Sequence, residues 1–118
     1  MADAPVGTEW IVDAHGCEPA SLQSCSTLAR LFAQIVQELD LHPVREPMWH
    51  VFPGEGGVTG VLVLTESHLT CHTFPEVGFA AFDLFCCRGG REWPWAARLR
   101  ETLGATEVSV RSVSRGGD

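Results

Sequence analysis

The chain contains no lysine, because all eight of its basic residues are arginine. Enzymes hold pyridoxal phosphate through a Schiff base with a lysine amine. The absence of lysine therefore excludes pyridoxal phosphate bound in that way. Any amine or amino-acid chemistry carried out by this chain needs a different electrophile.

Positive charge and long apolar runs are also scarce. The net charge of −7 disfavours nucleic acid as a partner, since nucleic-acid binding depends on clustered Lys and Arg. The same charge suits either a cationic small substrate or simple solubility. Apolar runs such as Val61 to Leu64 are far too short to span a bilayer, and the N-terminus lacks a basic region followed by an apolar run. We expect a cytoplasmic protein without nucleic-acid or membrane partners.

Cysteine is present in an odd number, five, and no secretory signal precedes it. We therefore expect free thiols rather than a disulfide framework. Residues of metal-ligating type occur without any paired Cys-x-x-Cys spacing, and strand alternation places Cys71 opposite both His68 and His72. These observations predict that the chain has no metal site.

The length of 118 residues predicts one domain, over residues 1–118. Apolar residues from Leu28 to Leu39 have the spacing of one helix face, and Pro94 and Gly104 suit the start and end of a second helix. Alternating patterns predict strands at residues 9–14, 48–52, 58–65, 67–73 and 78–87 and around 108–110. This order predicts an α+β fold, a two-layer α/β sandwich whose antiparallel sheet carries two helices on one face.

One short segment gathers a hydroxyl, two imidazoles, carboxylates and two thiols. It comprises Glu66-Ser67-His68, then His72-Thr73-Phe74-Pro75-Glu76, then Cys86-Cys87 on the next strand. Such a concentration of reactive groups in a small domain indicates chemistry at this place. Strand alternation makes the two adjacent cysteines point in opposite directions.

From Gly57 to Cys87 the sequence resembles the prokaryotic S-adenosylmethionine decarboxylase proenzymes. The resemblance continues more weakly through Trp93-Pro94-Trp95 and covers roughly residues 9–113. It implies the same α/β sandwich and a pyruvoyl-dependent decarboxylase that makes the aminopropyl donor for spermidine synthesis. It also implies a homodimer of two-chain protomers, because bacterial members of the family are dimers.

The resemblance implies that Ser67 is the precursor of the pyruvoyl group. Ser67 would attack the carbonyl carbon of Glu66 to form an ester, and β-elimination with loss of ammonia would follow. The products would be a β chain, residues 1–66, and an α chain, residues 67–118. His72 matches the family's processing base. Thr59 occupies the position of a hydroxyl that assists processing, where the family usually has Ser.

The resemblance also assigns roles in turnover. The pyruvoyl carbonyl would form a Schiff base with the substrate amine and act as an electron sink, as pyridoxal phosphate does elsewhere. Cys87 matches the proton donor, whereas Cys86, where the family commonly has Thr, is expected in the core. Glu76 matches a carboxylate that reaches the ribose hydroxyls. Phe52 and Phe74 would provide aromatic faces for adenine and for the sulfonium.

The sequence departs from the family at Gly7-Thr8-Glu9-Trp10, in place of Gly-Arg-His-Leu, and in a lengthened glycine-rich hairpin after Pro53. These departures leave the residues of the processing centre unchanged, but they leave the identity of the substrate undecided. Relatives that decarboxylate ornithine or arginine use the same machinery, and the acidic charge suits a cationic amino acid. A further alternative is a homologue that is not processed and serves as a binding or regulatory subunit.

Overall fold

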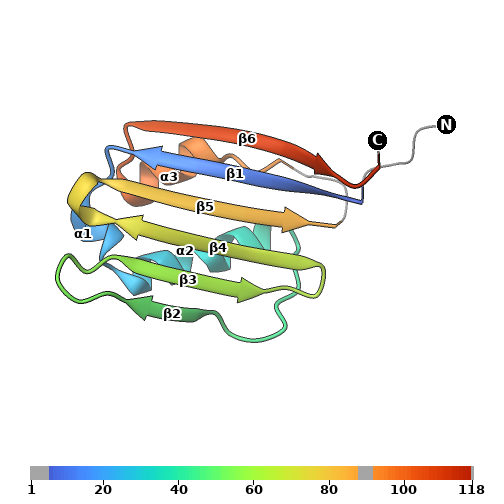
Figure 1. Ribbon diagram of the computed structural model, residues 1–118, viewed down its shortest axis with the longest axis horizontal. Helices are drawn as coiled ribbons and strands as arrows, with labels where there is room; N and C mark the ends of the chain where they lie inside the picture. The colour runs from blue at the N-terminus through green and yellow to red at the C-terminus, as the bar shows by residue number, and fades with distance from the viewer. Residues whose placement is uncertain (1–5, 88–91, 118) are drawn as a thin grey trace.

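A computed structural model describes residues 6–87 and 92–117 of the chain. Its centre is one six-stranded antiparallel sheet with the strand order β2-β3-β4-β5-β1-β6 (Figure 1). No helix in these residues is long and apolar enough to cross a membrane. The strands are β1 (Gly7–His15), β2 (Met48–Val51), β3 (Val58–Val63), β4 (Ser67–Phe74), β5 (Phe79–Cys86) and β6 (Glu107–Arg115).

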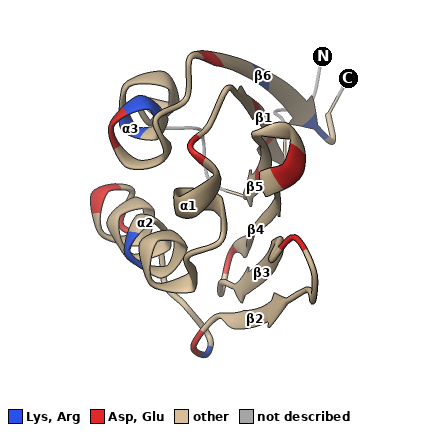
Figure 2. Ribbon diagram, turned by 90° about the vertical axis from the view of Figure 1, so that its left-hand side faces the viewer, with Lys and Arg blue, Asp and Glu red and all other residues tan. Residues whose placement is uncertain are grey.

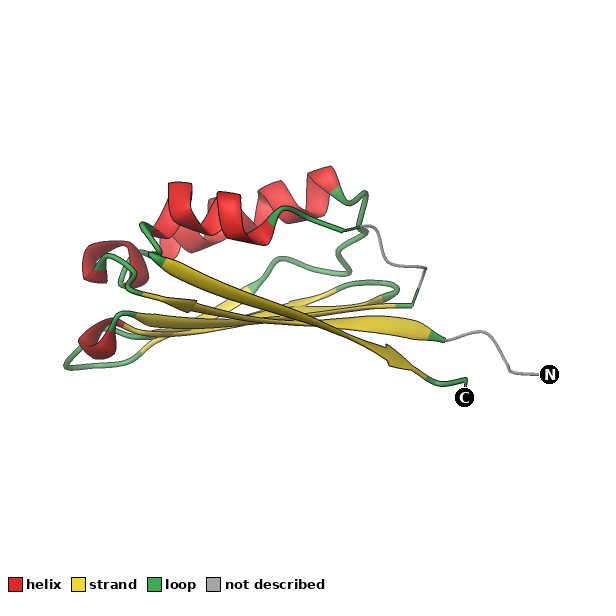
Figure 3. Cartoon of the chain, turned by 90° about the horizontal axis from the view of Figure 1, so that it is seen from above, coloured by secondary structure: helices red, strands yellow, loops and turns green. Residues whose placement is uncertain are grey.

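The two longer helices, α2 (Cys25–Glu38) and α3 (Trp95–Leu103), lie on the same face of the sheet (Figures 2 and 3). The predicted two-layer α+β sandwich is therefore confirmed. Two short elements were not predicted, the single turn α1 (Pro19–Leu22) and the 3₁₀ helix η1 (Pro75–Val77). Elements of three or four residues are too short for an apolar period to show in the sequence.

The core lies between the helices and the covered face of the sheet. Strand alternation buries Leu69 and Cys71 of β4 while leaving His68 and His72 more exposed, as the sequence pattern predicts. The helix face predicted from spacing is also confirmed, because α2 buries Leu28, Leu31, Phe32 and Ile35. From α3, the buried residues are Trp95, Leu99 and Leu103.

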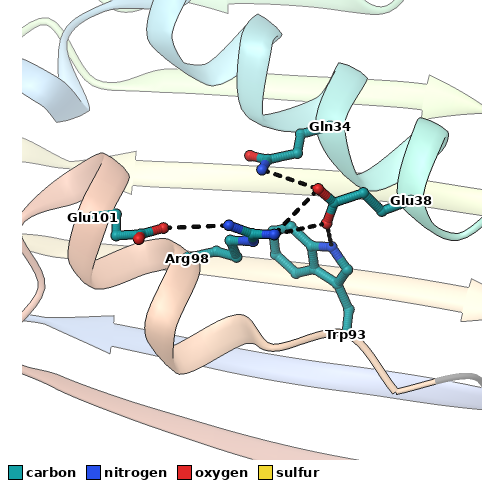
Figure 4. A network of polar contacts seen from close by, with 5 residues as sticks. All are labelled: Gln34, Glu38, Trp93, Arg98 and Glu101. Atoms are coloured by element: carbon teal, nitrogen blue, oxygen red, sulfur yellow. Dashed lines mark hydrogen bonds and ion pairs between the residues drawn. The ribbon is translucent and has the colours of Figure 1, made fainter.

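A polar network joins the two longer helices (Figure 4). Glu38 at the end of α2 accepts hydrogen bonds from Trp93 Nε1 at 2.8 Å, from Gln34 Nε2 at 3.2 Å and from Arg98 Nη2 at 3.2 Å. Arg98 also donates to Glu101 at 3.5 Å. The bond from Trp93 and those from Gln34 and Arg98 hold the pKa of Glu38 below its ordinary value. The network thus fixes the segment before α3 against α2.

Candidate active site

Thr59 and His72 face each other across β3 and β4. They are direct partners in the strand register, and Thr59 Oγ1 lies 3.3 Å from His72 Nδ1. Both side chains point to the sheet face that the helices leave open, because their neighbours Val58, Cys71 and Thr73 are buried on the helix side. The structure therefore brings the predicted processing base and its assisting hydroxyl into contact.

A cavity of about 330 Å³ lies around this pair. It contains five of the residues selected from the sequence, two of them aromatic and one a carboxylate. The lining residues are Phe52, Pro53, Glu55, Gly57, Thr59, His72, Thr73, Phe74 and Glu76. The predicted substrate-binding residues and the Thr59–His72 pair thus share one cavity.

Local backbone features shape the cavity. The loop from β2 to β3 closes through a hydrogen bond from the Phe52 amide to the Gly57 carbonyl at 2.8 Å. On the other side, Pro75 begins η1 and Gly78 ends it with a positive φ of 64°. This turn carries Glu76 at the surface beside the cavity.

Thr73 anchors the cavity to the core, a role that the sequence did not indicate. Its hydroxyl donates to the Leu22 carbonyl at 2.7 Å and accepts from the Val58 amide at 2.9 Å. Thr73 is 4 % exposed. Because Leu22 belongs to the unpredicted helix α1, the sequence pattern gave no signal for this contact.

Ser67 lies at the opposite end of β4 from His72. His72 is five positions after Ser67 along the strand, which corresponds to roughly 17 Å, and alternation turns the two side chains to opposite faces. The Ser67 Oγ is buried and has no hydrogen-bond partner in the part of the chain that the structure describes. Within one chain, the structure therefore does not bring the predicted nucleophile and processing base together.

The thiol opposite Ser67 belongs to Cys86. The two residues are paired in the β4–β5 register, and Cys86 is partly buried against the core as expected. Burial raises the pKa of the Cys86 thiol, and the neighbouring Ser67 hydroxyl acts in the other direction. Cys87 follows the end of β5 and is exposed. The sequence did not predict that Cys86 is the thiol beside Ser67.

Charged side chains from four strands lie on the open face toward the Ser67 end of the sheet. Burial, and then Glu9, raise the pKa of Asp83 to about 6, while His68 and Arg115 act in the opposite direction. His68 Nε2 lies 4.0 Å from Asp83 Oδ1, and Arg115 Nη1 donates to Glu9 Oε1 at 2.6 Å.

Over residues 6–87 and 92–117, no three His, Cys, Asp or Glu side chains are grouped to hold a metal ion.

Comparison with known proteins identifies the family. The family model described as S-adenosylmethionine decarboxylase matches residues 8–116. The chain belongs to this family. Two S-adenosylmethionine decarboxylase proenzymes, from Caldicellulosiruptor saccharolyticus and Clostridium tetani, are 36% and 35% identical to it over 113 residues. The alignments cover 94% of this chain and 89% and 87% of those proteins.

The fold of this S-adenosylmethionine decarboxylase family member also occurs in a solved structure. The crystal structure of the adenosylmethionine decarboxylase from Aquifex aeolicus VF5 superposes with a TM-score of 0.78 at 22% sequence identity. The superposition covers 97% of this chain and 93% of the other. The predicted family and the predicted fold are both confirmed.

Proposed function

We propose that this chain is a self-processing, pyruvoyl-dependent S-adenosylmethionine decarboxylase. The observation that carries the proposal is the family match over residues 8–116. Relatives named S-adenosylmethionine decarboxylase proenzyme, 36% and 35% identical, support both self-cleavage and this substrate. They do not favour ornithine or arginine as substrate, nor an unprocessed subunit. The cytoplasmic location and the role in spermidine synthesis stay predictions.

Self-cleavage starts at the Glu66–Ser67 peptide bond. Ser67 Oγ bonds to the Glu66 carbonyl carbon, the C–N bond breaks, and the hydroxyl proton passes to the Ser67 nitrogen. A base then removes the Ser67 α-proton, the Cβ–O bond breaks and the main-chain α-carboxylate of Glu66 leaves as the new C-terminus of the β chain. The dehydroalanine at residue 67 tautomerises to an imine, and water converts this imine to the pyruvoyl ketone and ammonia. The position of the Ser67 hydroxyl supports this role, because it is buried at the bond to be cleaved and its residue is paired with Cys86. His72 is the proposed base, and Thr59 orients it.

The pyruvoyl group thus formed at residue 67 supplies a carbonyl electrophile that takes the substrate amine and accepts the electrons released with carbon dioxide. Cys87 is the proposed donor of the proton that the substrate carbon then receives. Its exposure at the end of β5 supports this role, since the side chain is free to meet a substrate.

The cavity around Thr59 and His72 suits a nucleoside with a sulfonium. Glu76 offers a carboxylate to the two ribose hydroxyls. Phe52 and Phe74 are 50% and 41% exposed and offer flat faces to adenine. Cation–π attraction of the sulfonium to such a face contributes on the order of 0.5–2 kcal/mol. Ornithine and arginine need neither feature.

A homodimer resolves the separation between Ser67 and His72. In an isologous pair whose open sheet faces meet, the turn before β4 in one copy can lie over the His72 end of β4 in the other, and the Ser67 side chain, which points to the helix side within each copy, must turn toward the interface. Apolar side chains on that face support such contact, since Val61, Val63 and Val113 are 37%, 53% and 42% exposed. Each site would then draw Ser67 from one copy and His72 from the other.

Intact mass spectrometry and a decarboxylation assay test the proposal. We expect the purified chain to split between Glu66 and Ser67, and Ser67→Ala to stay whole because no hydroxyl remains to accept the acyl group. We expect carbon dioxide release from S-adenosylmethionine to exceed that from ornithine or arginine at least about tenfold in kcat/KM. A folded wild-type chain that stays whole would refute the assignment as a self-processing enzyme. A processed enzyme that prefers ornithine or arginine would refute only the assignment of S-adenosylmethionine as substrate.

A further inference from the structure

His42 lies beside the Glu66–Ser67 bond although 24 residues separate it from Glu66 in the sequence. Its Nδ1 is 2.6 Å from Glu66 Oε2. Because a carboxylate only accepts hydrogen bonds, the imidazole Nδ1–H is the donor. The His42 main chain takes part as well, since its carbonyl accepts from the Thr65 amide at 2.8 Å. Both the side chain and the main chain of His42 therefore contact the turn that contains the bond to be cleaved.

The segment that carries His42 is itself fixed to the sheet. The Val44 amide donates to the Val63 carbonyl at 2.9 Å, and Pro43 forms a β-bridge with Leu64. Through these contacts, residues 43–44 pair in an antiparallel manner with the end of β3 and the residue that follows it. His42 is thus held at a constant position relative to the turn.

The Glu66 carboxylate is enclosed and ionised. Its side chain is 11% exposed, and Oε1 is buried without a hydrogen-bond partner among the described residues. The hydrogen bond from His42 lowers the pKa of Glu66 to about 2, with support from its own backbone N–H and from Thr65 against the opposing effect of burial. The negative charge of this carboxylate also contributes to raising the pKa of the Cys86 thiol on β5. His42 is therefore the main partner of a carboxylate that is held close to the turn.

The backbone of the turn is closed on both sides. The Leu64 amide donates to the Ser67 carbonyl at 2.9 Å, and the Ser67 amide donates to the Leu64 carbonyl at 3.2 Å. Thr65 and Glu66 are the two residues between them. Among the described residues no backbone amide donates to the Glu66 carbonyl, so the contact of the Glu66 side chain with His42 is a further constraint on the orientation of that carbonyl.

We propose that His42 is a positioning residue for self-cleavage. By holding the Glu66 carboxylate, it keeps the Glu66 carbonyl carbon in the orientation that Ser67 Oγ attacks, and so raises the rate of O–C bond formation and C–N bond breakage. His42 touches neither reacting atom and acts only through the Glu66 side chain. The inference rests on the proposed self-processing function.

The test measures the fraction of full-length chain that is cleaved against time, by intact mass, in the folded full chain. We expect His42→Ala to slow cleavage about ten- to hundredfold, the usual effect of losing an orienting contact near a reacting bond. His42→Asn, whose amide nitrogen can occupy the position of Nδ1, should restore the rate to within about threefold of wild type. His42→Phe, which keeps the ring but has no donor, should stay slow.

Two controls separate positioning from a general loss of structure. Glu46→Ala changes an exposed residue of the same connecting segment and should cleave at the wild-type rate. In a Glu66→Ala background, His42→Ala should slow cleavage no further, because the side chain through which His42 acts is gone. Urea denaturation midpoints of all variants show whether any slow variant is simply unfolded.

Several results would overturn the assignment while leaving self-cleavage intact. Wild-type rates in His42→Ala or in His42→Phe would show that the donor is not needed. Slow cleavage by His42→Asn, or a full additional loss in the Glu66→Ala background, would show that His42 does not act through the carboxylate. A folded wild-type chain that is never cleaved would instead overturn the proposed function and this inference together.

Discussion

At the scale of single residues, two adjacent cysteines have different surroundings. Cys86 is paired with Ser67 in the sheet, whereas Cys87 lies beyond the strand and is exposed. We expect Cys87→Ala to cleave itself normally but to lose turnover by ~10²–10⁴-fold, the usual effect of removing a positioned proton donor. Single-turnover carbon dioxide release from processed enzyme measures this. If Cys86→Ala loses turnover and Cys87→Ala does not, the thiol beside Ser67 is the donor.

Asp83 gives a second prediction, on the pH dependence of stability. Burial and Glu9 raise the pKa of Asp83 from 3.8 to about 6. Between these values the folded chain binds more protons than the unfolded chain, so its stability falls as the pH rises. Asp83→Asn removes this loss. We expect the urea midpoint of Asp83→Asn to exceed that of wild type at about pH 7.5, and the gain to shrink near pH 4.

A matched variant on the same face checks this explanation. Asp13 lies 4.0 Å from Arg111, so Asp13→Asn removes an ion pair and should give no gain at about pH 7.5. All midpoints are compared at one protein concentration, since a dimer would cover both residues. Equal midpoints for wild type and Asp83→Asn at both pH values would contradict the prediction.

The residues of the site were predictable from the sequence to different extents. The family resemblance over residues 57–87 singled out Thr59, His72 and Glu76, because a family motif is recognised from the order of residues along the chain. His42 and Thr73 were not predicted. Their partners, Glu66 and the Leu22 carbonyl, are 24 and 51 residues away, and only the folded chain brings them together.

At the scale of elements, helix α2 depends on its first turn. Ser24 is the N-cap, and its Oγ accepts a hydrogen bond from the Thr27 amide at 3.2 Å. We expect Ser24→Ala to lower the free energy of unfolding by about 1 kcal/mol, because an amide at the helix start loses its partner. Urea denaturation measures the change. Ser26→Ala removes a hydroxyl that lies 3.1 Å from the Ser24 hydroxyl but leaves the bond from the Thr27 amide to Ser24 in place. It should cost clearly less, and equal losses would contradict the capping role.

The length of each helix or strand, and so the number of times its pattern of apolar residues repeats, decided how well it could be predicted. α2 and β4 repeat their apolar residues over several turns or pleats, so both followed from the sequence. α1 and η1 are too short to repeat anything, yet they contribute Leu22 beneath the cavity and Glu76 beside it. The elements that complete the cavity are therefore the ones that sequence periodicity does not detect.

At the scale of the whole molecule, strand order depends on pairings between distant parts of the chain. β1 lies between β5 and β6, so the first strand pairs with the last two (Figure 1). The antiparallel sandwich followed from element order and length, but the positions of strands in the sheet did not, because pairings of this kind leave no local pattern. The same order puts Ser67 and Cys86 at one end of neighbouring strands and His72 at the other.

The last prediction tests whether two copies build each site. Ser67→Ala lacks the nucleophile and His72→Ala lacks the base, so neither variant alone should cleave at the wild-type rate. In a mixed dimer, a site shared between copies contains the intact Ser67 of the His72→Ala chain and the intact His72 of its partner. We expect the His72→Ala chain to be cleaved after mixing, to at most about half when the variants are equal and pair at random, while the Ser67→Ala chain stays whole. Intact mass distinguishes the two chains, and mixing His72→Ala with itself is the control. If mixing restores no cleavage although the subunits exchange, each site is built within one copy, and the ends of β4 must approach each other by a rearrangement of the single chain.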